Sequence, residues 1–400
     1  MRPLEAQHIV ASTELTKHYT QKVLDIRRLY GERDWTVLGS FDDNKDCSPE
    51  RRLNVRDRRQ SRSASICSRK HEMPKSSRPS LTSVEVCSGA GGQALGLEMA
   101  GFDHLQLVEL DKPACATLRL NRPAWDVHEG DLREYSAAHL KGVDLIAGGV
   151  PCPPFSKAGK QLGKADDRDL FPEAIRLVDE SRPQAVMLEN VRGMLDTLFD
   201  EYRATLIRQL KKLGYHAEWR LLNASDYGVP QLRPRVIFVA IRKDFTEHFR
   251  WPEAHENRAP TVGAALKDLM AADGWKGAQL WANRADDIAP TLVGGSKKHG
   301  GPDLGPTRAK RAWATLGVDG MGIANEPPSA DFVGMPRLTV RMAARIQGFP
   351  DEWQFSGKKT NAYRQIGNAF PPPVAEAVGR SIAKALDLAA SSTKKLAKRA

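Results

Sequence analysis

The chain is predicted to be an α/β protein with a mostly parallel sheet and helices on both faces. From Ser83 onward, short apolar runs alternate with helical patterns, and a glycine-rich turn joins the first run to the first helix. This alternation is typical of βα units. Strands are expected at 84–87, 105–109, 125–128, 143–147, 184–189, 216–222 and 235–241, and helices at 92–100, 111–120, 169–180 and 197–213.

Composition indicates a soluble globular protein. Of its 400 residues 41% are hydrophobic, and no apolar run is long enough to span a bilayer or to serve as a signal peptide. The five cysteines are odd in number, and none forms a Cys-x-x-Cys pair. We therefore expect a reduced, cytoplasmic protein with neither a disulfide framework nor a metal site, and no membrane association.

The net charge of +11 is concentrated in two segments. Residues 51–80 hold ten Lys or Arg against two acidic residues, and the tail adds Lys394, Lys395, Lys398 and Arg399. Such basic, Ser-rich sequence is expected to be disordered and to add salt-sensitive, sequence-independent affinity for nucleic acid. The predicted parts are an N-terminal extension at 1–82, a catalytic domain at 83–243, a smaller irregular domain at 244–336, C-terminal helices at 337–390 and a basic tail at 391–400.

The secondary-structure patterns before Ser83 and after Lys243 are weaker than those between these residues. One helix is expected at about 13–30, and the βα alternation stops near Lys243 in favour of sequence rich in Gly, Pro and Trp. Two helices then close the domain, one after the N-cap candidate Thr339 and one after the three prolines at 371–373.

The first predicted strand leads into a turn with Gly89 and Gly91, and Glu109 ends the second strand. This spacing fits a nucleotide-binding turn followed by an acid that holds ribose hydroxyls, so it is compatible with a nicotinamide cofactor or with S-adenosylmethionine. Asp131 ends the third strand, where its carboxylate can accept a hydrogen bond from an adenine amine. Cys152 follows the fourth strand in a proline-rich loop that has no role in hydride transfer, which favours S-adenosylmethionine.

A nucleophile and an acid at successive strand ends suit covalent attack on a ring. Cys152 provides the thiol, and Glu189 ends the fifth strand. Taken alone, each residue is compatible with a purely structural role, and Glu189 with Arg235 could form an ordinary ion pair.

Over about residues 83 to 385 the chain resembles the DNA (cytosine-5) methyltransferases of bacterial restriction–modification systems. Nine blocks occur in the family's order: Gly89-Ala90-Gly91-Gly92, Val108-Glu109-Leu110-Asp111, Gly130-Asp131-Leu132-Arg133, Pro151-Cys152-Pro153-Pro154-Phe155-Ser156, Asp167-Arg168-Asp169-Leu170-Phe171, Glu189-Asn190-Val191, Gln231-Leu232-Arg233-Pro234-Arg235, Arg345-Ile346-Gln347-Gly348-Phe349-Pro350 and Gln365-Ile366-Gly367-Asn368-Ala369-Phe370-Pro371.

The resemblance implies a Rossmann-like S-adenosylmethionine-dependent fold and a role for each matching residue. Cys152 would be the nucleophile and Glu189 the acid on the cytosine ring, with Arg235 on the cytosine carbonyl and Arg233 in support. S-Adenosyl-L-methionine would be bound by Gly89, Gly91, Glu109, Asp131, Leu132, Leu170, Asn368 and Ala369. Double-stranded DNA would be contacted by Ser156 and by residues of the 244–336 domain, with Lys297, Lys298, Arg308, Lys310 and Arg311 as candidates.

Two residues depart from the family pattern. Cys87 stands where an aromatic usually precedes the glycine motif, and Met342 stands where an acid usually follows the arginine of a later block. The expected enzyme is a monomer that shares its site with a cognate restriction endonuclease. Three other functions remain open: methylation of tRNA by the same family, a regulatory DNA-binding role for residues 1–80, and, at the level of fold, an NAD enzyme.

Overall fold

The computed structural model describes residues 80–151, 168–294 and 302–397, with side chains up to Ser391. All the described residues belong to one compact unit, Pro74–Ala400. The helix expected at 13–30 and nearly all of the basic stretch at 51–80 lie outside them.

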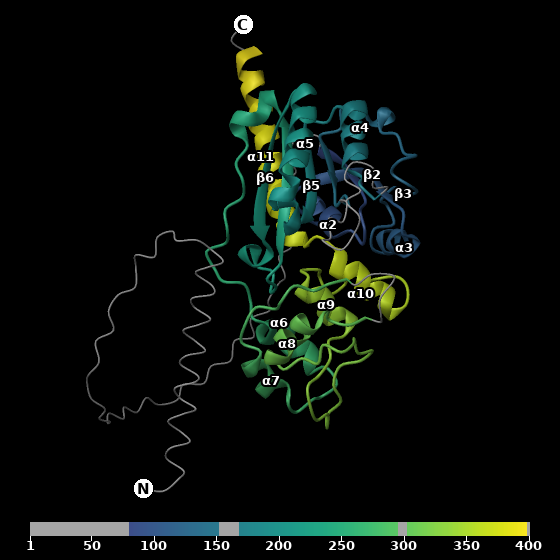
Figure 1. Ribbon diagram of the computed structural model, residues 1–400, viewed down its shortest axis with the longest axis vertical. Coiled ribbons are helices and arrows are strands. Elements are labelled where there is room, and N and C mark those ends of the chain that lie inside the picture. Colours follow the sequence, from purple (N-terminus) through teal and green to yellow (C-terminus); the bar gives the residue numbers. More distant parts are fainter. Residues whose placement is uncertain (1–79, 152–167, 295–301, 398–400) are drawn as a thin grey trace, which may run out of the picture. The chain divides into compact units, whose positions relative to one another are not determined.

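A seven-stranded mixed sheet forms the centre of the described unit (Figure 1). The strand order is β3-β2-β1-β4-β5-β7-β6. The strands are β1 (Leu81–Val86), β2 (Phe102–Glu109), β3 (Val127–Glu129), β4 (Leu145–Gly148), β5 (Ala185–Val191), β6 (Tyr215–Asn223) and β7 (Pro234–Arg242). Each overlaps a strand predicted from the sequence. Most are short stretches rich in apolar residues, which are long enough for a strand and too short for a helix.

Helices cover both faces of the sheet, as expected. On one face α4 and α5 share a core with Val84, Ile146 and Phe238. On the other, α2 and α11 pack over Ala147 and Met187, and α3 joins α2 over Leu107. The bounds are α2 (Gly92–Met99), α3 (Lys112–Asn121), α4 (Phe171–Ser181), α5 (Asp200–Lys212) and α11 (Pro372–Ala397).

One strand runs against the others. β7 pairs antiparallel with both β5 and β6, whereas β1 to β5 pair in parallel. The β6–β7 connection holds only a short 3₁₀ turn, η4 (Ala224–Tyr227), and a parallel crossover needs a dozen or more residues. The first residues of β7 therefore lie beside the last residues of β5.

Residues 244–336 are less irregular than their composition indicates. They contain α6 (Val262–Met270), α7 (Ala278–Arg284) and α8 (Thr307–Thr315). These helices share a second core with α9 (Val340–Ile346) and α10 (Lys359–Asn368), centred on Trp281, Trp313 and Tyr363. Figure 1 shows α6 to α10 gathered together, while α11 runs along the sheet. The domain boundaries proposed from the sequence remain predictions.

The helix expected after Thr339 is α9, and its cap explains how Met342 replaces an acid. The Thr339 hydroxyl accepts a hydrogen bond from the Met342 amide, and the Met342 thioether accepts the Thr339 amide at 3.4 Å, which closes a capping box through sulfur. Arg341 pairs with Asp351 at 2.9 Å. An ion pair is therefore present in this block without the acid at position 342.

Among the described residues, no helix is both long and apolar enough to cross a bilayer.

Candidate active site

Two adjoining cavities open at the carboxyl ends of β1, β2 and β4. One has a volume of about 450 Å³ and is lined by Glu85, Glu109 and Glu189 among others. The other, of about 490 Å³, is lined by Asp131, Leu132 and Leu170 among others. Cys87 and Glu109 border both cavities. Volumes of this order are typical of small-molecule and cofactor sites, and open α/β sheets bind ligands at this edge.

Most of the residues predicted to bind the cofactor lie on these walls. Gly89, Asn368 and Ala369 line the first cavity, Asp131, Leu132 and Leu170 line the second, and Glu109 lies between them. Gly91 lines neither cavity. It begins α2 with a φ of 83°, and a Cβ there would lie 2.7 Å from Leu118, so glycine is required for the turn itself.

Glu109 ties the glycine turn to the next strand. One of its oxygens accepts the Gly89 amide and the other accepts the Asp111 amide, each at 2.7 Å. Burial raises the pKa of Glu109, and these amide donors act against that rise. Each carboxylate oxygen keeps a second lone pair that could accept a ligand hydroxyl.

Asp131 lines the second cavity. Its carboxylate pairs with Arg133 at 2.6 Å, and this hydrogen bond lowers the pKa of Asp131. Cys87, which replaces the family aromatic, adopts a positive φ of 51°. Burial and nearby carboxylates raise the pKa of the Cys87 thiol to about 12, so it stays neutral and is no competitor for the role of nucleophile.

A buried acid and a guanidinium meet at the edge of the sheet. Glu189 Oε1 lies 2.7 Å from Arg235 Nε, and both side chains are nearly buried. Val191 pairs with Arg235 and Glu189 with Ile237, so Glu189 and Arg235 are diagonal neighbours on one face of the β5–β7 ladder. Burial raises the pKa of Glu189, although the charges of Arg235 and Arg233 oppose the rise.

Arg233 is not placed to touch a substrate. It is 0% exposed, and its guanidinium donates to the carbonyls of Leu292 (2.8 Å), Gly367 (2.8 Å) and Ala369 (3.0 Å). The last two carbonyls end α10, where backbone acceptors lack helical partners and the dipole favours a cation. In the structure Arg233 joins β7 to the second core, and its predicted support of Arg235 stays a prediction.

The segment before Cys152 is held by its neighbours. The Asn190 side chain donates to the Val150 carbonyl at 2.9 Å, and the Leu170 amide donates to the Pro151 carbonyl at 3.2 Å. Pro151 also lines the second cavity. Cys152 and Ser156 themselves lie outside the described residues.

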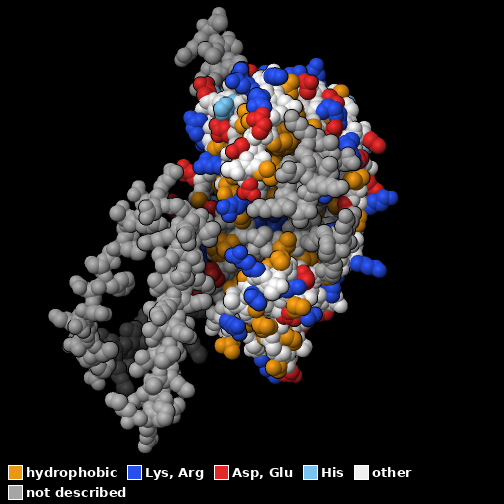
Figure 2. Space-filling view, viewed as in Figure 1, with side chains coloured by type: hydrophobic (Ala, Val, Ile, Leu, Met, Phe, Trp, Pro, Cys, Tyr) orange, Lys and Arg blue, Asp and Glu red, His pale blue; other side chains and the backbone are white. Residues whose placement is uncertain are grey.

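The predicted DNA contacts are only partly described. Arg308 and Arg311 are exposed on α8, three residues apart and hence on one side of the helix, whereas Lys310 is paired with Asp303 at 2.7 Å. Lys297 and Lys298 lie outside the described residues. Figure 2 shows Lys and Arg side chains interspersed with acidic and apolar ones on the face viewed.

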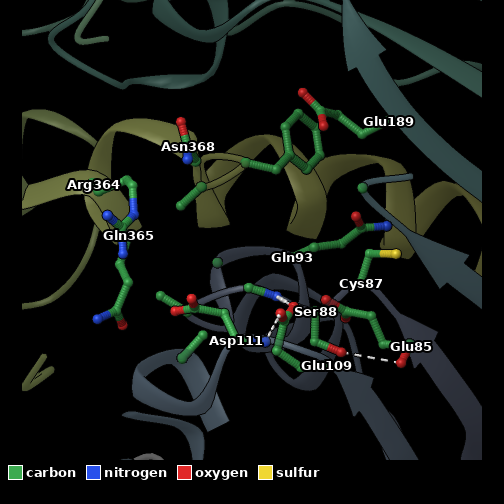
Figure 3. Close-up of a pocket in the computed structure, with 17 residues that line it drawn as sticks. Glu85, Cys87, Ser88, Gln93, Glu109, Asp111, Glu189, Arg364, Gln365 and Asn368 are labelled. Atoms are coloured by element: carbon green, nitrogen blue, oxygen red, sulfur yellow. Dashed lines mark hydrogen bonds between the residues drawn. The ribbon is translucent and has the colours of Figure 1, made fainter. Parts of the chain in front are cut away.

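Sequence reasoning missed several residues of the first cavity. Figure 3 shows Glu85, Cys87, Gln93 and Glu189 along one side of it, opposite a group from α10. Glu85 could have been singled out, because it is the charged residue of β1 and lies in the buried half of that strand. That opposite group is Arg364, Gln365 and Asn368.

No group of three or more His, Cys, Asp and Glu side chains suited to a metal occurs in the described part of the chain.

Comparison with known proteins agrees with this geometry. The chain is 59% identical to the type II methyltransferase M.NgoMIV of Neisseria gonorrhoeae over 76% of its length and 98% of that protein. It is 61% identical to M.NaeI of Lentzea aerocolonigenes over 77% of its length and 76% of that protein. A putative DNA modification methyltransferase from an Escherichia coli prophage shares the fold, with a TM-score of 0.54 at 23% identity, over 77% of this chain and 100% of that one. The model of the C-5 cytosine-specific DNA methylases matches residues 81–384, and the chain belongs to this enzyme family.

Proposed function

We propose that this enzyme transfers a methyl group from S-adenosyl-L-methionine to carbon 5 of a cytosine that is turned out of a specific duplex DNA site, through a transient bond to Cys152. The observation that carries the proposal is the buried Glu189–Arg235 pair. It stands beside a two-part cavity and next to the held segment that ends at Pro151.

The cavity residues fit the proposed cofactor. Glu109 and Asp131 offer carboxylate acceptors to ribose hydroxyls and to an adenine amine, and Leu132 and Leu170 add apolar surface for the ring. The first cavity presents buried, unpartnered acceptor oxygens on Glu85 and Gln93 to the other end of the molecule. When bound, S-adenosylmethionine supplies a methyl group attached to a positively charged sulfur.

Carbon 5 of cytosine is a poor nucleophile until the ring is activated. In the proposed reaction the Cys152 thiolate bonds to ring carbon 6, which pushes an electron pair toward carbon 5 and ring nitrogen 3. Glu189 in its acid form gives a proton to nitrogen 3, and Arg235 donates hydrogen bonds to the adjacent carbonyl. After carbon 5 has gained the methyl group, nitrogen 3 returns its proton to Glu189. Loss of the carbon 5 hydrogen as a proton to solvent then expels the thiolate and restores the ring.

The target base must leave the stack to reach such a site, as it does in other methyltransferases that act on bases. We assign the reading of the DNA sequence to residues 244–336, with Arg308 and Arg311 as the described contacts. We also assign to the enzyme a role in protecting host DNA against a cognate endonuclease, in the bacterial cytoplasm and as a monomer. The likeness to two type II methyltransferases supports the link to restriction–modification.

Bisulfite sequencing of plasmid DNA from cells that express the chain tests this proposal. We expect protected cytosines at one sequence context, and none with Cys152→Ser at matched protein levels. DNA that carries 5-fluorocytosine in that context should become covalently attached to the wild-type protein, because fluorine cannot leave as the proton does. If labelled methyl groups entered tRNA and not duplex DNA, the tRNA branch of the family would be favoured.

A further inference from the structure

Most arginines in the described part of the chain are held by the protein itself. Their guanidinium groups pair with acidic side chains, donate to carbonyls or lie over an aromatic ring, as in Arg122, Arg233 and Arg220. The arginines without such a partner among the described residues are Arg192, Arg308, Arg311 and Arg364. Arg364 lines the first cavity, and the other two lie on α8 in the region assigned to DNA reading, which leaves Arg192 without a role.

Arg192 directly follows β5, the strand that carries Glu189. It is exposed, and Val191 before it is 51% exposed, whereas Asn190 is only 5% exposed. The chain therefore leaves the core over these residues and brings Arg192 to the surface near the buried Glu189–Arg235 pair. Three residues at about 3.3 Å each place the backbone of Arg192 roughly 10 Å from that of Glu189.

The register of the sheet places Arg192 on the side of Arg235. Val191 is paired with Arg235 in the β5–β7 ladder, and Arg192 is the next residue along the chain. The order along this edge is therefore Glu189 first, then the level of Arg235, and then Arg192.

A cytosine nucleotide bound as proposed follows the same order. Glu189 contacts ring nitrogen 3, and Arg235 contacts the carbonyl oxygen on carbon 2. Carbon 2 is bonded to nitrogen 1, which carries the sugar, and the sugar carries the phosphates. The backbone of the nucleotide therefore leaves the ring on the side of Arg235 that faces away from Glu189, which is the side of Arg192.

We propose that Arg192 binds a phosphate of the target strand next to the extruded cytosine. This inference rests on the proposed function and adds a contact to it. The planar guanidinium can give two parallel hydrogen bonds to phosphate oxygens, and no acceptor among the described residues competes for it. Extrusion costs the duplex its stacking and pairing of that base, so a phosphate contact at this point favours the extruded nucleotide.

A binding experiment that neutralises one phosphate at a time tests this contact. The full chain, with S-adenosylhomocysteine present, is titrated with short duplexes that carry the sequence context methylated in cells. In each duplex one phosphate near the target cytosine is replaced with an uncharged methylphosphonate. For the wild-type protein we expect a loss of about tenfold in affinity at one of the phosphates that flank the target.

Arg192→Gln should bind the unmodified duplex about tenfold more weakly and lose nothing further at that methylphosphonate, because the pair is already broken. At the other phosphates the variant should lose as much affinity as wild type does. Its slope of log binding constant against log salt should be smaller by about 0.9. A purely structural role would instead weaken the binding of every duplex alike.

Arg208→Gln is the matched control. Arg208 is also exposed, but it pairs with Glu201 at 2.6 Å on α5 and lines neither cavity. This variant loses the same charge as Arg192→Gln. Its affinity for the unmodified duplex and its response to each methylphosphonate should match those of wild type.

The inference is wrong if the losses from Arg192→Gln and from the methylphosphonate multiply at every position tested. The proposed function would survive that result, because it requires only that the wild-type protein methylates this context. If the wild-type protein does not methylate duplex DNA, the proposed function and the inference both fail. Should Arg192→Gln fail to fold, Arg192→Lys replaces it: its loss on the unmodified duplex should vanish at the same methylphosphonate, and a loss that persists there overturns the inference.

Discussion

Replacing Arg233 with methionine should destabilise the protein more than it alters the chemistry. Arg233→Met keeps the side-chain length and removes three hydrogen bonds from a buried guanidinium to the carbonyls of Leu292, Gly367 and Ala369. Each bond to a charged donor is worth about 1.5–3 kcal/mol, but the three are not additive and water can enter the gap. We expect a loss of about 3–5 kcal/mol in the free energy of unfolding.

Thermal unfolding followed by circular dichroism measures this loss. At about 2 °C per kcal/mol for a chain of this size, the Tm should fall by roughly 6–10 °C. Below that temperature, kcat should stay within about tenfold of wild type, because Arg233 is fully buried and reaches no substrate.

Arg235→Met is the matched control, since Arg235 lies in the same strand and pairs with Glu189 at the cavity. It should abolish most activity with a smaller fall in Tm. If Arg233→Met kept the wild-type Tm and lost activity as Arg235→Met does, the positioning role assigned to Arg233 would be wrong.

Three further outcomes are expected. Glu189→Gln should lower kcat by about 10²-fold or more. Because burial raises the pKa of Glu189, wild-type activity should fall as pH rises through that pKa, and the residual activity of the variant should not. A pH–rate profile in which the variant also loses activity over this pH range would contradict the role. Glu109→Ala should raise the KM for S-adenosylmethionine by about 10–100-fold with a smaller effect on kcat, measured by initial rates, and an unchanged KM would argue against a ribose contact. Replacing Arg308 and Arg311 with glutamine should reduce the slope of log binding constant against log salt by about 0.9 for each lost phosphate contact, and an unchanged slope would exclude both residues from the DNA interface.

Most of the strands were predictable because they are short stretches rich in apolar residues, bounded by turn residues or amphipathic helices. The direction of β7 was not among the predictions, although the chain carries a signal for it: only ten residues, 224–233, separate β6 from β7. That length suits an antiparallel return and is too short for a helical crossover. The length of this connection could therefore have been used to predict that β7 runs antiparallel to β6.

The helices of 244–336 were obscured by composition. Thr261 is an N-cap whose hydroxyl accepts the Ala264 amide, and Val262, Leu266 and Leu269 recur at helical spacing behind it. The surrounding glycines and prolines concealed this short pattern. Its stability comes from the shared core with α9 and α10, which is a tertiary contact that local sequence does not reveal.

In the candidate site, too, some residues could be predicted from local sequence and others depend on tertiary contacts. Residues at strand ends, such as Glu109 and Glu189, could be located because parallel strands bring their carboxyl ends to one edge. The partners of Arg233 could not be predicted, because they are carbonyls 59 and more residues away in the chain.

The reversed direction of β7 makes the length of one turn critical. Glu189 and Arg235 lie two register positions apart in the same ladder, so their separation is set by the sheet. If 224–233 lost or gained one residue and β7 slipped by one position, every side chain of β7 would change faces. Arg235 would then enter the core beneath α4 and α5, where Phe238 and Ala240 now lie. Indels should therefore be far rarer in this hairpin turn than in the loops that join sheet strands to surface helices.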